Sequence, residues 1–350
     1  MKVINYFDSA KALEEATSRT AITGGKEHLF FGGTAYLGLN KHPEFISLFI
    51  EGVKRYGINN GTSRMNNVQL GIYDQAEKYV AAKFGFQDAI LLSSGFLAAQ
   101  LVVRHLAKNY EPENILYSPF SHPALWLSQN PNVKGSFEVW AELTVQQINQ
   151  SSSRQFLVIS NSFDNIIPKR FNFNIFNAVH PDKQVQFIVD DSHGLGIFQP
   201  DQTTIAANLR LCVVASMAKG LGIDAGVLLA DQQTIASLRN TGVFIGASPT
   251  APAFLHALIQ GEQIYREQWQ KLQDNIKFFE NSLPQAEKWE YLSNYPVFHR
   301  PGIAYAKKLA EKGILISSFP YPDPTDQPLD RMVLSAAHRR EDLEILLSYL

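Results

Sequence analysis

The sequence predicts an α/β protein, in which a mostly parallel sheet of about seven strands is flanked by helices and followed by a smaller C-terminal α+β domain. The first observation behind this prediction is that several strand-like segments are continuous apolar runs, among them Phe156 to Ser160 and Val185 to Val189. Strands covered by helices on both faces have this character, whereas half-exposed strands alternate. The second observation is that these runs alternate along the chain with segments of helical period.

Composition limits the classes of function. The chain has 350 residues, of which 45% are hydrophobic, and a formal net charge of −2. It can therefore bury a large core, while the near-neutral charge argues against nucleic acid or an anionic membrane as partners. No apolar run reaches the roughly 18 residues of a membrane span, and the single cysteine, Cys212, excludes a disulfide within the chain. We expect a cytoplasmic protein that acts on small molecules.

The N-terminal part is expected to form a short helix at Ala10 to Arg19, a strand at His28 to Phe31 and a Gly-rich turn from Gly32 to Leu39. A helix should begin at Pro43, because proline at the first helical position loses no hydrogen bond, and end near Tyr56. The polar segment Asn59 to Asn67 is rich in turn formers and predicts a loop.

Pairs of strand and helix follow in the middle of the chain. Apolar residues at helical spacing predict a helix from Gln69 to Phe84, ended by Gly85. A strand at Ala89 to Leu92 then turns through Ser93 to Phe96 into a helix that runs to about Asn109. Further strands are expected at 115–118, 137–140, 156–160, 185–190, 211–216 and 226–229, with helices from Pro123 and near Val145.

The C-terminal part begins with a long helical pattern. Apolar residues keep helical spacing from Pro252 to Leu283, which predicts one helix of about thirty residues that joins two domains. Beyond it we expect strands at 296–299, 314–317 and 332–335, helices at 302–312 and 340–350, and a Pro-rich loop at 319–328. The expected parts are an N-terminal segment, residues 1–36, that packs with the small domain, a large domain, 37–270, and the small domain, 271–350.

Lys219 lies in a short turn, Ser216 to Gly222, between the apolar strands that end at Ser216 and begin at Gly226. Its neighbours are small or apolar, so we expect its ammonium group to lose hydration and its amine to become available for Schiff-base chemistry. A solvated loop lysine would show the same local pattern. The assignment therefore depends on other segments.

Three other segments follow predicted strands, where open α/β sheets build their sites. Ser94-Gly95-Phe96 opens a helix, and free N–H groups there favour a phosphate, although such turns are also common structural features. His122 precedes a helix at Pro123, where it could present an imidazole or simply cap that helix.

The third segment, Asp190-Asp191-Ser192-His193-Gly194, places an acidic pair at the end of a buried strand. Burial of a carboxylate is costly without a cation or several donors. A protonated pyridine nitrogen is such a cation. There are two alternatives: a metal site with Asp190 and His193 as ligands, or a structural ion pair. No other Asp, Glu or His cluster nearby in the sequence completes a set of metal ligands, which argues against the metal site. With a lysine and a phosphate turn, the set favours pyridoxal phosphate.

Taken together, these segments resemble the α-oxoamine synthase family of fold-type I pyridoxal phosphate enzymes, from about Phe31 to the C-terminus. The motifs that carry the resemblance are Tyr36 to Leu39 with His42 to Glu44, Gly61 to Arg64, Ser94 to Phe96, Asp190 to Gly194, Ala218 to Gly222 and Leu334 to His338. The resemblance implies a homodimer with shared active sites.

The resemblance also implies roles for individual residues. Lys219 would form the Schiff base, Asp190 would pair with the pyridinium nitrogen, and His122 would stack on the ring. The remaining cofactor contacts would come from His193 near the ring hydroxyl and from Ser94, Gly95, Phe96 and Ser216 at the phosphate. Arg331 would bind the amino-acid carboxylate, for which a planar guanidinium is suited.

The substrate side departs from the family pattern. Thr34 and Ala35 replace an Asn-Asp pair, Tyr73 replaces a histidine, and the stretch Ser160 to Asn165 is shorter than in the family and lacks its glutamate. We take Thr34 and Tyr73 as candidate substrate-binding residues. Ile245-Gly246 replaces a Ser-Thr pair whose phosphate contact would come from the second subunit.

The expected activity is condensation of an amino acid with an acyl-CoA thioester to give an aminoketone, of the 8-amino-7-oxononanoate synthase type. The partners are then an amino acid and an acyl-CoA or acyl carrier. Two alternatives stay open: an aminotransferase or another reaction on the same fold, and a non-catalytic subunit that keeps the fold. The retention of Lys219, Asp190 and His122 together argues against the non-catalytic subunit.

Overall fold

The computed structural model describes residues 12–164, 167–198, 206, 208–284, 288–320 and 328–350, and the chain divides into two compact units. The large unit comprises residues 47–164 and 170–261, and the small unit comprises 1–46, 165–169 and 262–350. The borders at 46/47 and 261/262 differ from the expected borders at 36/37 and 270/271. We describe each unit by itself.

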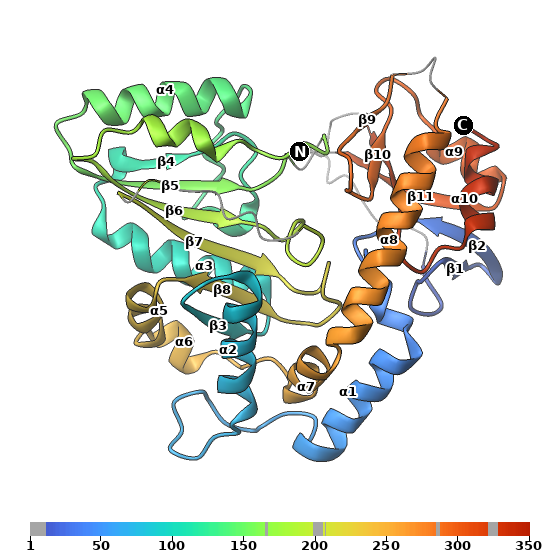
Figure 1. Ribbon diagram of the computed structural model, residues 1–350, viewed down its shortest axis with the longest axis horizontal. Helices are drawn as coiled ribbons and strands as arrows, with labels where there is room; N and C mark the ends of the chain where they lie inside the picture. The colour runs from blue at the N-terminus through green and yellow to red at the C-terminus, as the bar shows by residue number, and fades with distance from the viewer. Residues whose placement is uncertain (1–11, 165–166, 199–205, 207, 285–287, 321–327) are drawn as a thin grey trace, which may run out of the picture. The chain divides into compact units, whose positions relative to one another are not determined.

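A six-stranded sheet in the order β3-β8-β7-β6-β5-β4 forms the centre of the large unit (Figure 1). Its strands are β3 (Asp88–Leu92), β4 (Ile115–Tyr117), β5 (Gln155–Asn161), β6 (Gln184–Asp190), β7 (Leu209–Ser216) and β8 (Gly226–Ala230). Strands β4 to β7 are parallel, and β8 runs antiparallel to both of its neighbours. The mostly parallel α/β sheet is as predicted, with six strands in the described part of the unit instead of seven.

The expected seventh strand, 137–140, is wrong, because these residues open helix α4 (Phe137–Gln150). The Ser136 hydroxyl accepts a hydrogen bond from the Val139 N–H (3.4 Å) and caps the helix. Phe137, Ala141 and Val145 are buried at helical spacing. This pattern extends over the whole helix, so it decides the structure against the strand propensity of the four residues 137–140.

Both faces of the sheet are covered, which explains the continuous apolar strands. Leu157, Ile159 and Val214 pack with α3 (Gly95–Leu106), α5 (Gln232–Arg239) and α6 (Gly242–Gly246). Phe156, Val158 and Phe187 belong to a second cluster, in which they pack with α4.

Two helix predictions for the large unit need correction. The helix expected from Pro123 is a single 3₁₀ turn, Pro123–Leu125. The helix expected from Pro252 to Leu283 is interrupted at Gly261, so that α7 (Pro252–Gln260) and α8 (Glu262–Ser282) are separate helices. Gly261 has a ψ of 10°, away from helical values, and the border between the units falls directly after it. The helix α2 (Ile72–Phe84) ends at Gly85 as predicted.

The small unit contains a second, mixed sheet in the order β1-β2-β11-β12-β10-β9. Its strands are β1 (Thr20–Thr23), β2 (Lys26–Phe31), β9 (Glu290–Tyr291), β10 (Val297–His299), β11 (Ile314–Pro320) and β12 (Pro328–Val333). The helices of the C-terminal part are α8, α9 (Ala306–Glu311) and α10 (Arg340–Leu347). Helix α1 (Pro43–Tyr56) begins at Pro43 as predicted and continues across the border into the large unit.

The N-terminal helix expected at Ala10 to Arg19 is not present in its described part, residues 12–19. Instead, the Arg19 guanidinium pairs with Asp342 at 2.9 Å, and strand β1 begins at the next residue. Tertiary contacts of this kind override a weak local helix pattern. Most of the Pro-rich loop, residues 321–327, lies outside the described residues.

No helix in the described ranges is both long enough and apolar enough to cross a bilayer.

Candidate active site at the carboxyl edge of the large sheet

The carboxyl ends of five strands meet at one edge of the large sheet. In the register of the sheet, Asn161 on β5 lies opposite Asp190 on β6, and Asp190 lies opposite Val214 on β7. Leu92, the last residue of β3, lies opposite Gly226, which also pairs with Ser216 at the end of β7. The segments that carry Gly95, His122, Asp190 and Lys219 therefore leave the sheet at the same edge, as predicted for an open α/β site.

The turn after β7 brings Lys219 to His193, with 3.2 Å between Lys219 Nζ and His193 Nε2. Met217 and Leu221 on either side of the lysine are buried and anchor the turn. Gly220 has no room for a side chain, because a Cβ atom there would collide with the carbonyl oxygen of Leu195. This close backbone approach holds the lysine turn against the turn that carries His193.

Hydrogen bonds link the end of β6 to the end of β7. The Asp190 carboxylate accepts a bond from the Ser192 N–H (2.9 Å), and the Ser192 hydroxyl accepts one from the Ser216 N–H (2.8 Å). Ser192 thus connects the predicted pyridinium partner to the lysine strand. Sequence reasoning missed this residue, since a serine between Asp191 and His193 carries no signal of its own.

Asp191 contributes a second carboxylate beside Asp190. Burial raises its pKa to about 6, although a bond from the Ser162 hydroxyl (2.5 Å) and the charge of Arg170 oppose the rise. The negative charge of Asp190 adds to the rise. The site therefore contains a carboxyl group that titrates near neutral pH.

His122 interacts electrostatically with both Asp190 and Lys219. Loss of hydration is the main cause of its lowered pKa; the charge of Asp190 raises the pKa and that of Lys219 lowers it. The residue as a whole is exposed to solvent. Its Nδ1 accepts a hydrogen bond from the Ala124 N–H (3.1 Å), so the neutral ring carries its proton on Nε2.

The start of α3 supplies the expected phosphate turn. The Ser94 hydroxyl accepts a bond from the Leu97 N–H (3.2 Å), so it caps the helix, whereas the N–H groups of Gly95 and Phe96 belong to the first turn and have no partner within the helix. A Cβ atom on Gly95 would lie 2.8 Å from Cα and Cβ of Ser216. Only glycine allows the helix to begin so close to the lysine strand.

The residues present fit pyridoxal phosphate. An amine, a solvent-exposed histidine, a carboxylate at a strand end and a helix N-terminus lie along one edge of one sheet. These are the groups that Schiff-base formation, ring stacking, pyridinium pairing and phosphate binding require.

Tyr73 is a core residue in this structure. Its side chain is 1% exposed, and its hydroxyl donates to the Thr250 carbonyl oxygen (3.2 Å). Burial raises its pKa, and the guanidinium of Arg64 over the ring lowers it. A role of Tyr73 in substrate binding stays a prediction.

Thr34 and Arg331 lie in the small unit. Thr34 belongs to the turn after β2, where its carbonyl oxygen accepts a bond from the Tyr36 N–H (2.9 Å). Arg331 lies on β12, with its guanidinium 5.0 Å from the centre of the Phe319 ring, and its charge opposes the rise in pKa that burial causes at Tyr36. Their roles in binding the substrate also stay predictions.

Arg64, which belongs to one of the family motifs, forms a buried ion pair. It is 7% exposed and donates two hydrogen bonds to Glu77 on α2, at 2.8 and 3.1 Å. This pair fixes the loop before α2 to the helix itself.

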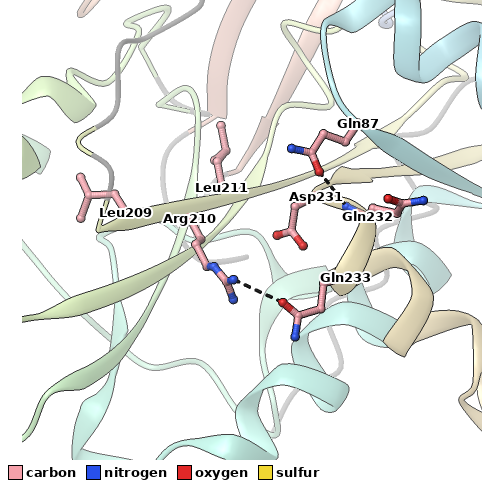
Figure 2. Close-up of a pocket in the computed structure, with 7 residues that line it drawn as sticks. All are labelled: Gln87, Leu209, Arg210, Leu211, Asp231, Gln232 and Gln233. Carbon is pink, nitrogen blue, oxygen red and sulfur yellow. Dashed lines mark hydrogen bonds between the residues drawn. The ribbon is translucent and has the colours of Figure 1, made fainter.

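A pocket of about 540 Å³ lies elsewhere in the large unit, at the opposite edge of the sheet (Figure 2). It is lined by the first residues of β7 and by the segment after β8, where Arg210 donates to Gln233 at 3.4 Å. Because the lysine turn follows the other end of β7, this pocket is separate from the candidate active site.

Comparison with known proteins identifies the family of this chain. The model of the family described as aminotransferase class I and II matches residues 31–350. The chain belongs to this family. It is 26% identical to an 8-amino-7-oxononanoate synthase of Saccharophagus degradans, with 100% of this chain and 93% of the relative covered. It is 24% identical to a serine palmitoyltransferase of Bacteriovorax stolpii, with coverage of 96% and 85%.

Solved structures show the same fold. The serine palmitoyltransferase of Sphingomonas wittichii superimposes with a TM-score of 0.82, at 18% identity, over 97% of this chain and 90% of that one. The predicted fold-type I architecture and the resemblance to α-oxoamine synthases are confirmed, and pyridoxal phosphate is the cofactor of this family. The roles assigned to individual residues stay predictions.

Proposed function

We propose that this protein is a pyridoxal phosphate dependent acyltransferase, which joins the α-carbon of an amino acid to the acyl group of a thioester such as acyl-CoA. The observation that carries the proposal is the 3.2 Å approach of Lys219 Nζ to His193 Nε2, at the edge where Asp190 and His122 also lie. The relatives named 8-amino-7-oxononanoate synthase and serine palmitoyltransferase support an acyl transfer of this kind.

Each residue would have one task toward the cofactor. Lys219 would hold it covalently, Asp190 would pair with its ring nitrogen, His122 would cover one ring face, and the first N–H groups of α3 would bind its phosphate. When bound, the cofactor supplies an electron sink for the charge left on the amino-acid carbon once a proton or carbon dioxide is removed.

Proton transfer would involve Lys219 and His193. Their nitrogens are within hydrogen-bond distance, so a proton can pass between the lysine amine and the imidazole. Once the amino group of the substrate has replaced it on the cofactor, the freed Lys219 amine would take up the α-proton of the amino acid, which would leave a carbon nucleophile. That carbon attacks the thioester carbonyl and the thiol leaves. Arg331 would bind the carboxylate of the amino acid, with Thr34 and Tyr73 as further candidates on the substrate side.

Visible absorption tests the cofactor half of the proposal. After incubation with pyridoxal phosphate and removal of the unbound cofactor, the purified protein should show a visible absorption band. This band should shift when single amino acids are added. A protein that stays colourless after this treatment contradicts the proposal.

Thiol release tests the acyl transfer. Acyl-CoA mixed with alanine, glycine or serine should yield free CoA thiol only in the presence of enzyme and amino acid. Release of a keto acid from the amino acid without free thiol would instead identify an aminotransferase. A homodimer and a cytoplasmic location stay predictions; light scattering of the purified protein checks the dimer.

A further inference from the structure

Asn161 holds both ends of the turn that presents His122. The Asn161 Oδ1 accepts a hydrogen bond from the His122 N–H (3.0 Å), and its Nδ2 donates one to the Phe120 carbonyl oxygen (2.7 Å). The side chain is 3% exposed, so these bonds do not compete with water. One buried amide therefore fixes the backbone on either side of Ser121.

The turn needs such support because it is strained. Phe120 has a φ of 58°, in the left-handed region that residues other than glycine adopt at a cost. The Trp126 Nε1 donates to the Ser121 carbonyl oxygen (2.8 Å) and adds a third anchor inside the same turn. A strained turn persists only where the surrounding contacts determine it in this way.

The place of Asn161 in the sheet links this turn to the rest of the site. Asn161 is the last residue of β5, and it lies opposite Asp190 in the register with β6. The side chain that fixes the His122 backbone thus extends from the strand next to the one that carries the predicted pyridinium partner. The distance between the His122 imidazole and the Asp190 carboxylate therefore depends on the adjacent ends of β5 and β6.

We propose that Asn161 is a positioning residue for the active site, which sets the orientation of the His122 imidazole relative to Asp190 through hydrogen bonds to the backbone of Phe120 and His122. The catalytic consequence rests on the proposed function, because it assumes that the imidazole covers the ring of a bound cofactor. Asn161 acts through His122 and needs no contact with substrate.

Two variants and a matched control test this role. Asn161→Asp keeps the acceptor for the His122 N–H but directs a carboxylate oxygen at the Phe120 carbonyl oxygen, and Asn161→Ala removes both bonds. Asn149 offers the control, because its amide accepts from the His180 N–H (2.8 Å) and donates to the Ala178 carbonyl oxygen (3.0 Å) at a different turn. Asn149→Asp therefore keeps the acceptor and removes the donor of an equivalent pair of bonds elsewhere in the large unit.

Titration with pyridoxal phosphate and circular dichroism in the visible band report on the bound ring. Both Asn161 variants should bind the cofactor about tenfold more weakly, the loss expected for one misplaced contact, and should change the sign or intensity of the visible dichroism. Asn149→Asp should leave the affinity and the dichroism at wild-type values even where it lowers the melting temperature. Unchanged affinity and dichroism in the Asn161 variants would overturn the inference.

Hydrogen exchange of the protein without cofactor separates this inference from the proposed function. The His122 amide should exchange slowly in the wild type and in Asn149→Asp, and much faster in Asn161→Ala, which removes its acceptor. A colourless wild type with a protected His122 amide contradicts the proposed function alone. A His122 amide that exchanges in the wild type as fast as an exposed loop amide overturns the role of Asn161, whatever the cofactor does.

Discussion

The large unit contains two groups of ionisable side chains with different surroundings. In the first group, Glu77 is 2% exposed and its carboxylate accepts bonds from Arg64 (2.8 and 3.1 Å), from Arg239 (3.2 Å) and from the Leu91 N–H (3.0 Å). Arg239 also pairs with Asp88 at 2.7 Å. Opposite charges and donors surround each charge, which makes this group a structural anchor.

The second group is the candidate active site, where like charges and lost hydration displace pKa values. The pKa of Asp191 is raised to about 6, chiefly by burial, and that of His122 is lowered, chiefly by loss of hydration. Lys219 Nζ lies 3.2 Å from His193 Nε2. The comparison teaches that the charges of the first group lie against opposite charges, whereas the second group combines buried ionisable side chains with displaced pKa values, as is common at functional sites.

Removal of the lysine should have the largest effect. Lys219→Ala should abolish the visible band and lower turnover by about a thousandfold or more, while the melting temperature stays at or above the wild-type value. Lys183 is the matched control, because its buried ammonium donates to the carbonyl oxygens of Ser151 (2.6 Å) and Ser153 (3.0 Å). Lys183→Ala should keep the band and lose stability. A band that survives in Lys219→Ala would show that another lysine holds the cofactor.

Disruption of the paired group should affect stability instead. Glu77→Gln leaves Arg64 and Arg239 without their shared carboxylate and should cost about 3–5 kcal/mol of unfolding free energy, measured by denaturant titration. Asp74, whose side chain is 75% exposed and 3.6 Å from Arg64, provides the comparison. Asp74→Asn should change little. Equal losses in the two variants would mean that burial of the pair is unimportant.

The second carboxyl of the site should give a pH-dependent signature. A pKa raised in the folded state means that stability is fully present below the unfolded value of 3.8 and is lost as the pH rises through about 6. Asp191→Asn removes this loss, so the variant should gain up to about 3 kcal/mol relative to wild type between pH 4 and pH 7. Chemical denaturation across that range measures the difference. A difference that does not vary with pH would contradict the raised pKa.

The smallest expected effect concerns the tyrosine beside Arg64. Tyr73→Phe removes the bond to the Thr250 carbonyl oxygen and should cost about 1 kcal/mol of stability, with no change in the visible band. A selective rise in KM for the amino acid or the thioester would place Tyr73 in the substrate site. Unchanged KM values would make it part of the structural group.

The sheet could be predicted because its signals are local. A run such as Val185 to Asp190 combines burial on both faces with a carboxylate at the strand end, and both properties are visible in the sequence. The start of α4 could not be predicted in the same way, because four residues fit a strand until the burial pattern of the whole helix is known. Gly261 similarly has no signal that distinguishes a helix break from a tolerated glycine.

The supporting residues of the site were harder to predict than the reactive ones. Asn161 is the last residue of β5 and Ser192 follows β6, and most polar residues at such positions have no role beyond the strand end or loop. Their roles depend on strand register and on backbone groups far along the chain. Such contacts become visible only when the strands are placed side by side.

Cys212 lies in the middle of β7, four residues before Ser216, and is fully buried. Burial is the main reason that its thiol pKa is raised to about 12, with a further contribution from the charge of Asp231. A thiol in this state does not react with soluble disulfides until the strand is exposed. Because this is the only cysteine of the chain, its rate of labelling reports a single event, the opening of the central sheet. The strand that carries the lysine turn therefore contains one thiol whose labelling rate measures the unfolding of the large unit.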